Sequence, residues 1–287
     1  MPISNEEWRH LEETANRLRK LTLDTTNWAG GGHIGGAMSA MDALTVLYHH
    51  TLNFSAQKMD DPERDRFVLS KGHIGVGMAA VLADLGCFPK EWLERFSRIG
   101  SPLGMHLDAN KVPGLEVSAG SLGHGLSMAV GLALGARYQK QSWRTYCMLG
   151  DAETDEGSIW EAAMSAAHYK LDNLCAMVDV NHAMIDGFTK DVMNLEPYPD
   201  KWRAFGWHVI ELKGNNIPAL VDAFDEAASV KGQPTMLLLD TVKGEGIDFM
   251  EGDYTWHYGS VDEEKYAKAE QSLERHLAKR LANVKGE

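Results

Sequence analysis

The sequence predicts an α/β fold, a doubly wound and mainly parallel sheet with helices on both faces. Two apolar, β-branched segments, 144–149 and 173–180, are predicted strands, and they lead into the polar residues Asp151 and Asn181. Between them, residues 156–170 place small apolar side chains at helical spacing, which lets a crossover helix lie close to a sheet. Strand–helix–strand units of this kind, repeated along a chain, are typical of a parallel sheet.

The N-terminal part predicts two helices separated by glycines. The first begins at Ser4, because Glu7 follows three residues later in the pattern of a capping box, and it ends near Trp28. The glycine-rich segment 30–36 then interrupts all periodicity. An apolar stripe predicts the second helix over 39–52.

A short apolar run at 65–70 predicts the first strand, and a helix follows it as far as Leu85. Residues 100–125 are rich in glycine and predict a long loop. Long irregular segments in compact domains are usually functional. A helix over 126–138 then leads to the strand–helix–strand unit.

The C-terminal half continues the alternation of predicted strands and helices. After Gly187 we expect a loop, then a strand at 207–212, a helix at 217–230, a strand at 234–242, a second loop at 243–259 and a charged amphipathic helix at 261–284. The length suits one large α/β unit, so we expect a single domain over residues 1–287.

Composition restricts the partners and the compartment. With 28 Lys and Arg against 41 Asp and Glu, the net charge is −13, which argues against nucleic acid and anionic membranes as partners. Cys87, Cys147 and Cys175 lie in or beside apolar runs, which favours buried, reduced thiols. The N-terminus is polar and acidic, and no run approaches the roughly 20 apolar residues of a membrane span. We therefore expect a soluble, cytoplasmic protein.

Asp151 and Asn181 are candidate metal ligands. The carboxyl ends of parallel strands meet at one edge of a sheet, so both side chains are expected to face one cleft. A carboxylate and an amide oxygen suit Mg²⁺ or Ca²⁺ when the phosphates of a ligand complete the coordination shell. The alternative is that both residues only cap the loops after their strands, since Asp and Asn are common turn residues.

The Gly-Asp pair at 150–151, followed at a distance by Asn181 and the tripeptide that begins at Ile185, resembles the motif with which thiamine diphosphate enzymes bind metal and pyrophosphate. The resemblance implies that Asp151, Asn181 and the carbonyl oxygen of Ala183 ligate Mg²⁺. It also implies cofactor contacts from Asp151, Ala152, Asn181 and Ile185. The family usually has glycine in place of Ala152, and glycine permits the closest approach of backbone to a ligand. Ala152 is therefore expected to weaken or reshape the diphosphate contact.

Four histidine segments resemble transketolases in particular. GGHIGGAMS around His33 resembles the family's SGHPGAPMG, and DRFVLSKGH ending at His73 is nearly identical to a family segment. His106 falls where the family has a Gly-His-Pro motif, and His257 ends a Lys-Gly…Trp-His segment. The resemblance implies that His33 and His257 move protons of substrate hydroxyl groups and that His106 orients the donor. It places His73 and His257 on the diphosphate. Imidazoles suit such proton transfers because they titrate near neutrality.

Two further segments complete the resemblance. The loop 120–125 resembles the family loop that packs on the diphosphate, which implies cofactor contacts from Gly120, Ser121 and Leu122. Glu156 and Glu161 match family glutamates that link the two cofactor sites across the dimer interface, and Glu156 is therefore expected near the cofactor as well. Without the resemblance, both glutamates would be interpreted as solvated helix carboxylates.

The resemblance covers the N-terminal, diphosphate-binding part of transketolases. It implies transfer of a two-carbon ketol unit from a ketose phosphate or similar anionic sugar to an aldose, by means of thiamine diphosphate. In the family, a pyrimidine-binding domain supplies the glutamate that activates the cofactor. We expect this domain on a partner chain that carries pyrimidine-binding and C-terminal domains, in an α2β2 heterotetramer.

Two alternatives are open. The chain would share its metal motif with subunits of deoxyxylulose phosphate synthase-like or 2-oxo acid dehydrogenase-like enzymes, but the histidines at 33, 73 and 257 are the transketolase set. A non-catalytic regulatory paralogue is the other alternative, for which Ala152 and His124, the latter in place of a usual glutamine, are the only indications.

Overall fold

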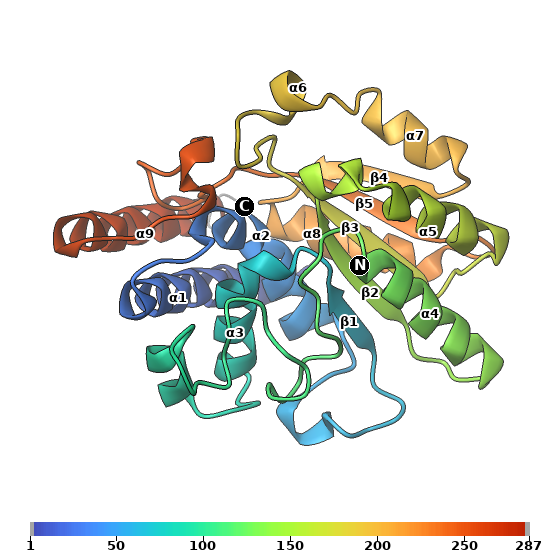
Figure 1. The fold of residues 1–287 in the computed structure, drawn as a ribbon, viewed down its shortest axis with the longest axis horizontal. Helices are drawn as coiled ribbons and strands as arrows, with labels where there is room; N and C mark the ends of the chain where they lie inside the picture. The colour runs from blue at the N-terminus through green and yellow to red at the C-terminus, as the bar shows by residue number, and fades with distance from the viewer. Residues whose placement is uncertain (1–2, 285–287) are drawn as a thin grey trace.

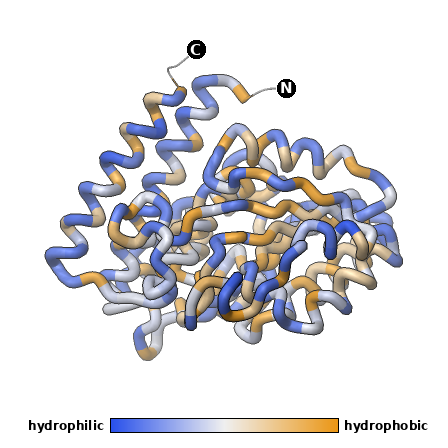
Figure 2. Tube along the Cα trace, turned by 90° about the horizontal axis from the view of Figure 1, so that it is seen from above, coloured by the Kyte–Doolittle hydropathy of each residue, from blue (hydrophilic) through white to orange (hydrophobic). Residues whose placement is uncertain are grey.

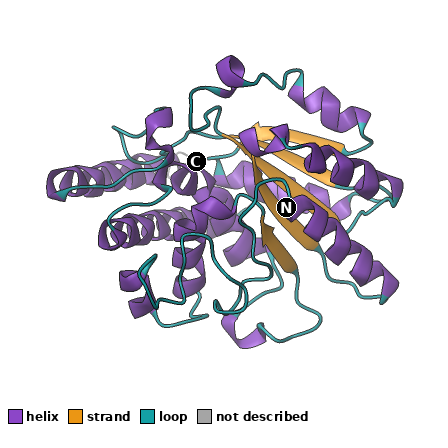
Figure 3. Cartoon of the chain, viewed as in Figure 1, coloured by secondary structure: helices purple, strands orange, loops and turns teal. Residues whose placement is uncertain are grey.

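The computed structural model describes residues 3–284, which contain a five-stranded sheet surrounded by helices (Figures 1 and 3). The strands are β1 (Arg66–Leu69), β2 (Thr145–Gly150), β3 (Leu174–Val180), β4 (His208–Lys213) and β5 (Thr235–Asp240). The α-helices are α1 (Asn5–Ala29), α2 (Ile34–Val46), α3 (Gly75–Asp84), α4 (Gly125–Tyr138), α5 (Gly157–His168), α6 (Thr189–Val192), α7 (Tyr198–Ala204), α8 (Ile217–Ser229) and α9 (Glu263–Val284).

The sheet is wound in both directions, as predicted. Its order is β1-β2-β3-β5-β4, and all four neighbouring pairs are parallel. The chain proceeds from β1 to β3, passes over one position to β4 and returns to β5 between them. Crossovers to parallel strands are right-handed, so α5 and α8, whose connections run in opposite directions, cover opposite faces.

Alternate strand residues divide the core into two layers. Tyr146 and Met148 pack with α1, α2, α3 and α8, whereas Cys147 and Leu149 pack with α4, α5 and α7. Figure 2 shows the strands as a largely apolar layer between helices whose outer sides are polar. A third cluster joins α1 and α2 to α9 and to the loop after β5, so the C-terminal helix packs along the first one.

The second helix begins earlier than predicted. It starts at Ile34, directly after His33, and a π-helical turn (Leu47–Thr51) follows it. The glycines 35 and 36 lie inside the helix, where packing is close at Gly36 and leaves no room for a side chain at Gly35. A Cβ at Gly35 would lie 2.5 Å from the carbonyl oxygen of Trp256. Close packing therefore outweighs the low helix propensity of glycine here.

The loop expected after Gly187 was wrong in part, because α6 and α7 lie within it. In α7, Pro199 occupies the first turn, where its missing N–H costs nothing, and Tyr198 and Trp202 are buried. Trp202 packs on Trp160 of α5 with ring centroids 4.9 Å apart. A single buried face on so short a helix has too few residues to show periodicity.

Other details agree with the sequence-based expectations. Ser4 Oγ accepts a hydrogen bond from Glu7 N at 3.2 Å. Cys87, Cys147 and Cys175 are buried free thiols, and burial raises the pKa of Cys87 to about 11. Within residues 3–284, we find no helix with the length and apolar character needed to cross a bilayer.

Candidate active site

A cavity of about 370 Å³ lies at the carboxyl edge of the sheet, where the loops after β1, β2, β3 and β5 converge. The residues that line it are His33, Gly36, Lys71, His73, His106, Gly120, Leu122, Gly150, Asp151, Ala152, Glu153, Asn181, Ala183, Met184, Ile185, Asp186, Lys243 and His257. Parallel sheets bind ligands at this edge. The cavity thus collects most of the site residues predicted from the sequence.

The predicted metal ligands lie together at the ends of β2 and β3. The Asp151 carboxylate accepts hydrogen bonds from the backbone N–H groups of Ala152 at 2.8 Å and His182 at 2.7 Å. Asn181 donates from Nδ2 to Asp179 at 2.8 Å, and its Oδ1 accepts from Ala183 N at 3.2 Å. The amide oxygen is thereby held on the side of Ala183.

These residues suit a divalent cation whose coordination shell is completed by phosphate oxygens of a ligand. Burial, together with the neighbouring Asp179 charge, raises the pKa of Asp151 to about 6, so a nearby cation would relieve a buried negative charge. No group of three or more His, Cys, Asp or Glu side chains within the described residues is arranged to hold a metal by itself. Two side chains and one carbonyl therefore suit a hard cation only when ligand oxygens contribute.

Asp179, which the sequence-based prediction missed, contacts two side chains that line the cavity, Lys71 and Asn181. It is fully buried and accepts hydrogen bonds from Lys71 Nζ at 2.5 Å, Ser39 Oγ at 2.7 Å and Thr241 Oγ1 at 2.5 Å. Burial opposes ionisation, but the Lys71 charge and these hydrogen bonds hold the pKa of Asp179 below its usual value. An aspartate inside an otherwise apolar strand was the available signal.

The four predicted histidines form one cluster. The ring centroid of His33 lies 5.2 Å from that of His73, 6.3 Å from His106 and 5.4 Å from His257. Burial is the main cause that lowers the pKa of His33 to about 4, of His73 to about 2 and of His257 to about 3, and nearby cationic groups lower each further. These three imidazoles are neutral at pH 7, so each ring can both accept and donate a hydrogen bond. His33 Nδ1 is buried without a hydrogen-bond partner among the described residues.

Two lysines were also missed. Lys71 follows β1, and Lys243 follows β5; both are buried and line the cavity. Lys243 Nζ donates to the carbonyl oxygen of Ala183 at 3.2 Å and lies 3.4 Å from His257 Nδ1. Burial and the Lys71 charge lower the pKa of Lys243 to about 8. An anion in the cavity would compensate this unfavourable placement of positive charge.

The glycine loop 120–125 is held against the sheet by Glu153. Its carboxylate accepts hydrogen bonds from Ser70 Oγ at 2.5 Å, from Gly123 N at 3.0 Å and from Gly150 N at 3.0 Å. Gly120 and Leu122 line the cavity, whereas Ser121 is exposed beside it. The loop therefore has the position expected of a phosphate-binding segment.

Glu156 and Glu161 lie outside the cavity. Glu156 directly precedes α5, Glu161 lies within that helix, and both side chains are exposed. Both carboxylates are thus accessible to a partner. Their role at a dimer interface stays a prediction.

The fold and the cavity define a class of protein. An oxygen-donor pair, two lysines and neutral imidazoles at the switch region of a parallel sheet are suited to a metal-bound diphosphate. Residues 11–282 match the family model described as transketolase, thiamine diphosphate binding domain. The chain therefore belongs to the transketolase family and comprises its thiamine diphosphate-binding domain.

Two relatives of similar length are named as transketolase subunits. The chain is 43% identical to the 6-deoxy-6-sulfo-D-fructose transketolase subunit SqwG of Clostridium sp. (strain MSTE9), over 92% of this chain and 96% of that protein. It is 39% identical to an apulose-4-phosphate transketolase subunit of Phocaeicola vulgatus, over 94% of this chain and 95% of that protein. The chain is accordingly a transketolase subunit.

Solved structures of transketolases share the fold. The chain superposes on the Campylobacter jejuni transketolase with a TM-score of 0.85 and 26% identity, and on the Leishmania mexicana transketolase with a TM-score of 0.83 and 30% identity. These matches cover 96% of this chain but only 46% and 45% of the solved chains. The chain thus spans less than half the length of these transketolases.

Proposed function

We propose that this chain is the diphosphate-binding subunit of a two-subunit transketolase that transfers a two-carbon ketol unit from an anionic ketose to an aldose. The observation that carries the proposal is the cavity, in which the metal-ligand set, two lysines and the histidine cluster converge. The relatives of matching length support it, because their names combine the word subunit with sugars that carry a sulfo or phosphate group.

In this proposal, Asp151, Asn181 and the carbonyl oxygen of Ala183 hold Mg²⁺, with Ca²⁺ as the alternative ion. Gly120, Leu122, Ala152 and Ile185 line the cavity and would contact the cofactor, whereas Ser121 and Glu156, which lie outside the lining, would contact it from the rim. Thiamine diphosphate, when bound, supplies the nucleophilic carbon and the electron sink that cleavage of a carbon–carbon bond requires. Lys71 and Lys243 balance the charge of its diphosphate, and the neutral His73 and His257 rings contact it as hydrogen-bond donors.

The remaining histidines act on the sugar. His33 and His257 are neutral and adjacent, so each can accept a proton from a substrate hydroxyl group and return it in the next step. His106 is exposed at the cavity and is proposed to orient the donor sugar. Because all three rings come from different loops, the cavity can contact several oxygen atoms of one substrate.

The proposal includes a partner. A second chain with the pyrimidine-binding and C-terminal domains would complete the site in an α2β2 assembly, with Glu156 and Glu161 at the interface between the two cofactor sites. We further propose that residues 1–287 form one domain, which the single sheet supports, and that the protein is cytoplasmic, which the three free thiols support.

The test is reconstitution. The chain is purified alone and together with the product of a neighbouring gene that encodes pyrimidine-binding and C-terminal domains, and ketol transfer is assayed with a panel of anionic ketoses. We expect turnover only from the complex, in the presence of thiamine diphosphate and Mg²⁺. Turnover by the chain alone would refute the two-subunit proposal. A verified complex that is inactive with every donor would favour the non-catalytic paralogue.

A further inference from the structure

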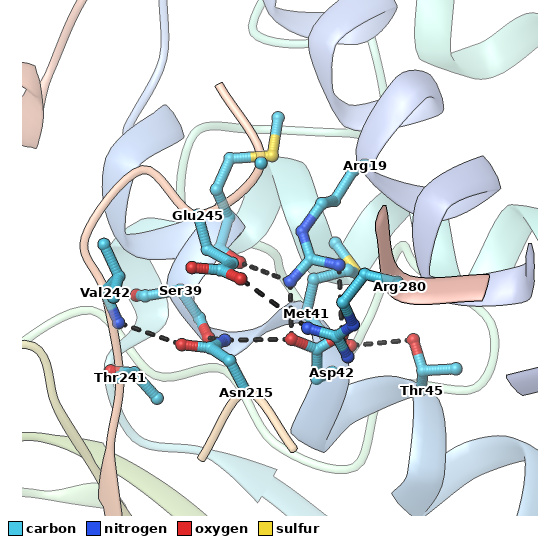
Figure 4. A network of polar contacts seen from close by, with 12 residues as sticks. Arg19, Ser39, Met41, Asp42, Thr45, Asn215, Thr241, Val242, Glu245 and Arg280 are labelled. Atoms are coloured by element: carbon cyan, nitrogen blue, oxygen red, sulfur yellow. Dashed lines mark hydrogen bonds and ion pairs between the residues drawn. The ribbon is translucent and has the colours of Figure 1, made fainter. Parts of the chain in front are cut away.

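A buried cluster of charged side chains lies behind the cavity and contributes no residue to its lining. It joins Glu12 and Arg19 of α1, Asp42 of α2, Glu245 of the loop after β5 and Arg280 of α9, most of which Figure 4 shows. The Arg19 and Asp42 side chains are 1% and 0% exposed and form two hydrogen bonds of 2.7 and 3.0 Å. The cluster therefore connects α1 and α2, near the N-terminus, with the loop after β5 and with α9, near the C-terminus.

Arg280 is the residue that connects α9 to the cluster. Its Nε donates to Glu12 at 2.7 Å, its Nη2 lies 3.4 Å from Asp42, and its Nη1 lies 3.6 Å from Glu245. His276, one turn earlier in α9, places Nε2 3.6 Å from the same Glu245 carboxylate. The C-terminal helix thus holds both the helical layer and the loop after β5.

That loop carries two side chains of the candidate active site, Lys243 and His257. Gly244 and Gly246, on either side of Glu245, have φ angles of 79° and 93°, a region in which only glycine is unstrained. The backbone can therefore turn so that Lys243 faces the cavity while Glu245 faces the cluster. Lys243 and Glu245 are only two residues apart, so a shift of the Glu245 carboxylate is transmitted to the site.

A second connection runs through Asn215. Its Nδ2 donates to Asp42 at 2.9 Å, and its Oδ1 accepts from Val242 N at 2.9 Å. Asp42 is therefore bonded both to the arginines of the cluster and, through Asn215, to the backbone at the start of the loop. The backbone N–H of Gly244 also donates to the carbonyl oxygen of Gly35 at 3.0 Å, close to His33. The start of the loop is thus held from two sides.

We propose that Arg280, Asp42 and Glu245 form a positioning cluster through which α9 fixes the loop 242–259, and with it the Lys243 amine and the His257 imidazole. The catalytic part of this inference rests on the proposed function. The structural part, that α9 orders the loop, does not. None of the three residues touches the cavity, so each acts through another group.

The ionised centre of the cluster is Asp42. Burial opposes its ionisation, but the charges of Arg19 and Arg280 hold its pKa far below the usual value. Removing one partner of such a buried pair leaves the other charge uncompensated, so the groups around it rearrange or admit water. Loss of the Arg280 charge or of the Asp42 charge is therefore expected to loosen the loop.

For Glu245, unlike Asp42, the effect of burial on the pKa outweighs that of the neighbouring arginines. Burial raises its pKa to about 7, with Asp42 and Glu251 adding to the shift while Arg19 and Arg280 oppose it. His276, which also faces Glu245, is neutral at this pH because burial and the charges of Arg19 and Arg280 lower its pKa to about 4. The closed loop therefore holds the Glu245 proton more tightly than the open loop does, and opening becomes more favourable as the pH rises from about 4.5 toward 7.

Hydrogen exchange on the full chain tests the structural part. We compare Arg280→Gln and Asp42→Asn, which keeps its shape, with Lys279→Gln, a control at the exposed neighbouring position of α9. Amides of residues 242–259 are expected to exchange about tenfold faster in both cluster variants, a typical coupling for groups in one ion network. The control should exchange like the wild type, and so should β2 and β3 in every folded variant.

If Arg280→Gln or Asp42→Asn does not fold, loop exchange in the remaining variant tests the proposal. Loop exchange at the wild-type rate in a folded cluster variant overturns the positioning cluster. Arg280→Lys, which keeps the charge, provides a third measurement and should exchange more slowly than Arg280→Gln.

The pH response of the wild type is an independent readout. Loop exchange, corrected for intrinsic rates, should become faster between about pH 5 and pH 7, because over this range the open loop releases the Glu245 proton that the closed loop retains. Glu245→Gln mimics the neutral carboxyl group and should abolish this change while leaving the loop closed. A pH response that persists in Glu245→Gln would overturn the assignment of Glu245.

The catalytic part is tested in the complete two-chain enzyme. Asp42→Asn should lower kcat more than it raises KM, because the loop carries reacting groups, and Arg280→Lys should restore part of the loss seen in Arg280→Gln. Unchanged kcat with a loosened loop would overturn the catalytic part. If the wild-type complex itself transfers no ketol unit, the proposed function fails, while faster loop exchange in the variants would still uphold the structural part.

Discussion

At the scale of single residues, the site contains ionisable groups whose burial is energetically unfavourable. The Asp151 carboxylate is buried, and no lysine, arginine or histidine within residues 3–284 forms an ion pair with it. Burial of the Lys243 amine carries the opposite cost, because burial disfavours its charged form, and the same effect keeps the imidazole of His33 neutral. Perturbed groups of both signs around one cavity are typical of a binding site rather than of a stabilising core.

We expect Asp151→Asn to lower the affinity for thiamine diphosphate in the presence of Mg²⁺ by about 100-fold or more, since loss of even an indirect metal contact costs roughly 10- to 100-fold. The fold should persist, because the substitution preserves shape. Calorimetry on the complete enzyme measures the affinity, with Asp225→Asn on the exposed side of α8 as the control. Undiminished affinity would exclude Asp151 as a metal ligand.

His257→Asn is expected to reduce kcat by about 10²- to 10⁴-fold, the usual contribution of a general acid or base. The free energy of unfolding should change by less than about 1 kcal/mol, because the ring lies at the edge of a cavity. Steady-state kinetics and urea unfolding measure the two effects, and His168→Asn at the exposed end of α5 is the control. Turnover at the wild-type rate would move the proton-transfer role to His33.

Glu245 should make stability depend on pH. Its pKa is raised from 4.5 to about 7 on folding, so the unfolded chain releases this proton first as the pH rises. Stability relative to Glu245→Gln is therefore fully present below about pH 4.5 and falls by up to about 3 kcal/mol as the pH approaches 7. Urea unfolding of both proteins across this range gives the difference, and a parallel pH dependence of the two would disprove the assignment.

At the scale of elements, α4 contains glycines of two kinds. A Cβ at Gly125 would lie 2.4 Å from the Ser70 side chain and 2.5 Å from its Cα, so the start of α4 must approach the end of β1 closely. Gly131, further along the same helix, is exposed and would place a Cβ in open space. Gly125 allows the close approach of α4 to β1 beside the site, whereas no neighbour among the described residues requires a glycine at position 131.

Gly125→Ala should therefore destabilise the chain by about 1–3 kcal/mol, as overpacking does, and should displace the loop 120–125. Gly131→Ala should stabilise it by about 0.5–1 kcal/mol, because alanine loses less backbone entropy in a helix. Urea unfolding of the two variants provides a matched pair. Equal effects of the two substitutions would contradict the packing described for Gly125.

The elements themselves were largely predictable. The five strands and the helices α1, α3, α4, α5, α8 and α9 were predicted within a few residues, because apolar runs and helical periodicity are local properties. The start of α2 was missed because its glycines are required by packing against Trp256 and Ile74, which lie elsewhere in the chain. Helix α7 was missed because seven residues carry too little periodic signal.

At the scale of the whole molecule, the two-subunit proposal predicts an assembly in which the exposed glutamates 156 and 161 lie at an interface. We expect two copies of this 31.7 kDa chain in the complex with its partner. Light scattering on the purified complex measures the mass, with the chain alone as the reference. Charge reversal at Glu161 should weaken the assembly, and a complex that holds one copy of this chain would contradict the α2β2 arrangement.

The parallel α/β architecture, the polar residues at the strand ends and the histidine segments could all be predicted from the residues alone, since each is a local pattern that a single stretch of chain contains. Which distant groups meet became clear only in the folded chain. Lys71 pairs with Asp179 across 108 residues, and Arg280 reaches Glu12 across 268. Sheet order and helix packing set these pairings, and both depend on how whole elements fit together, which no local period encodes.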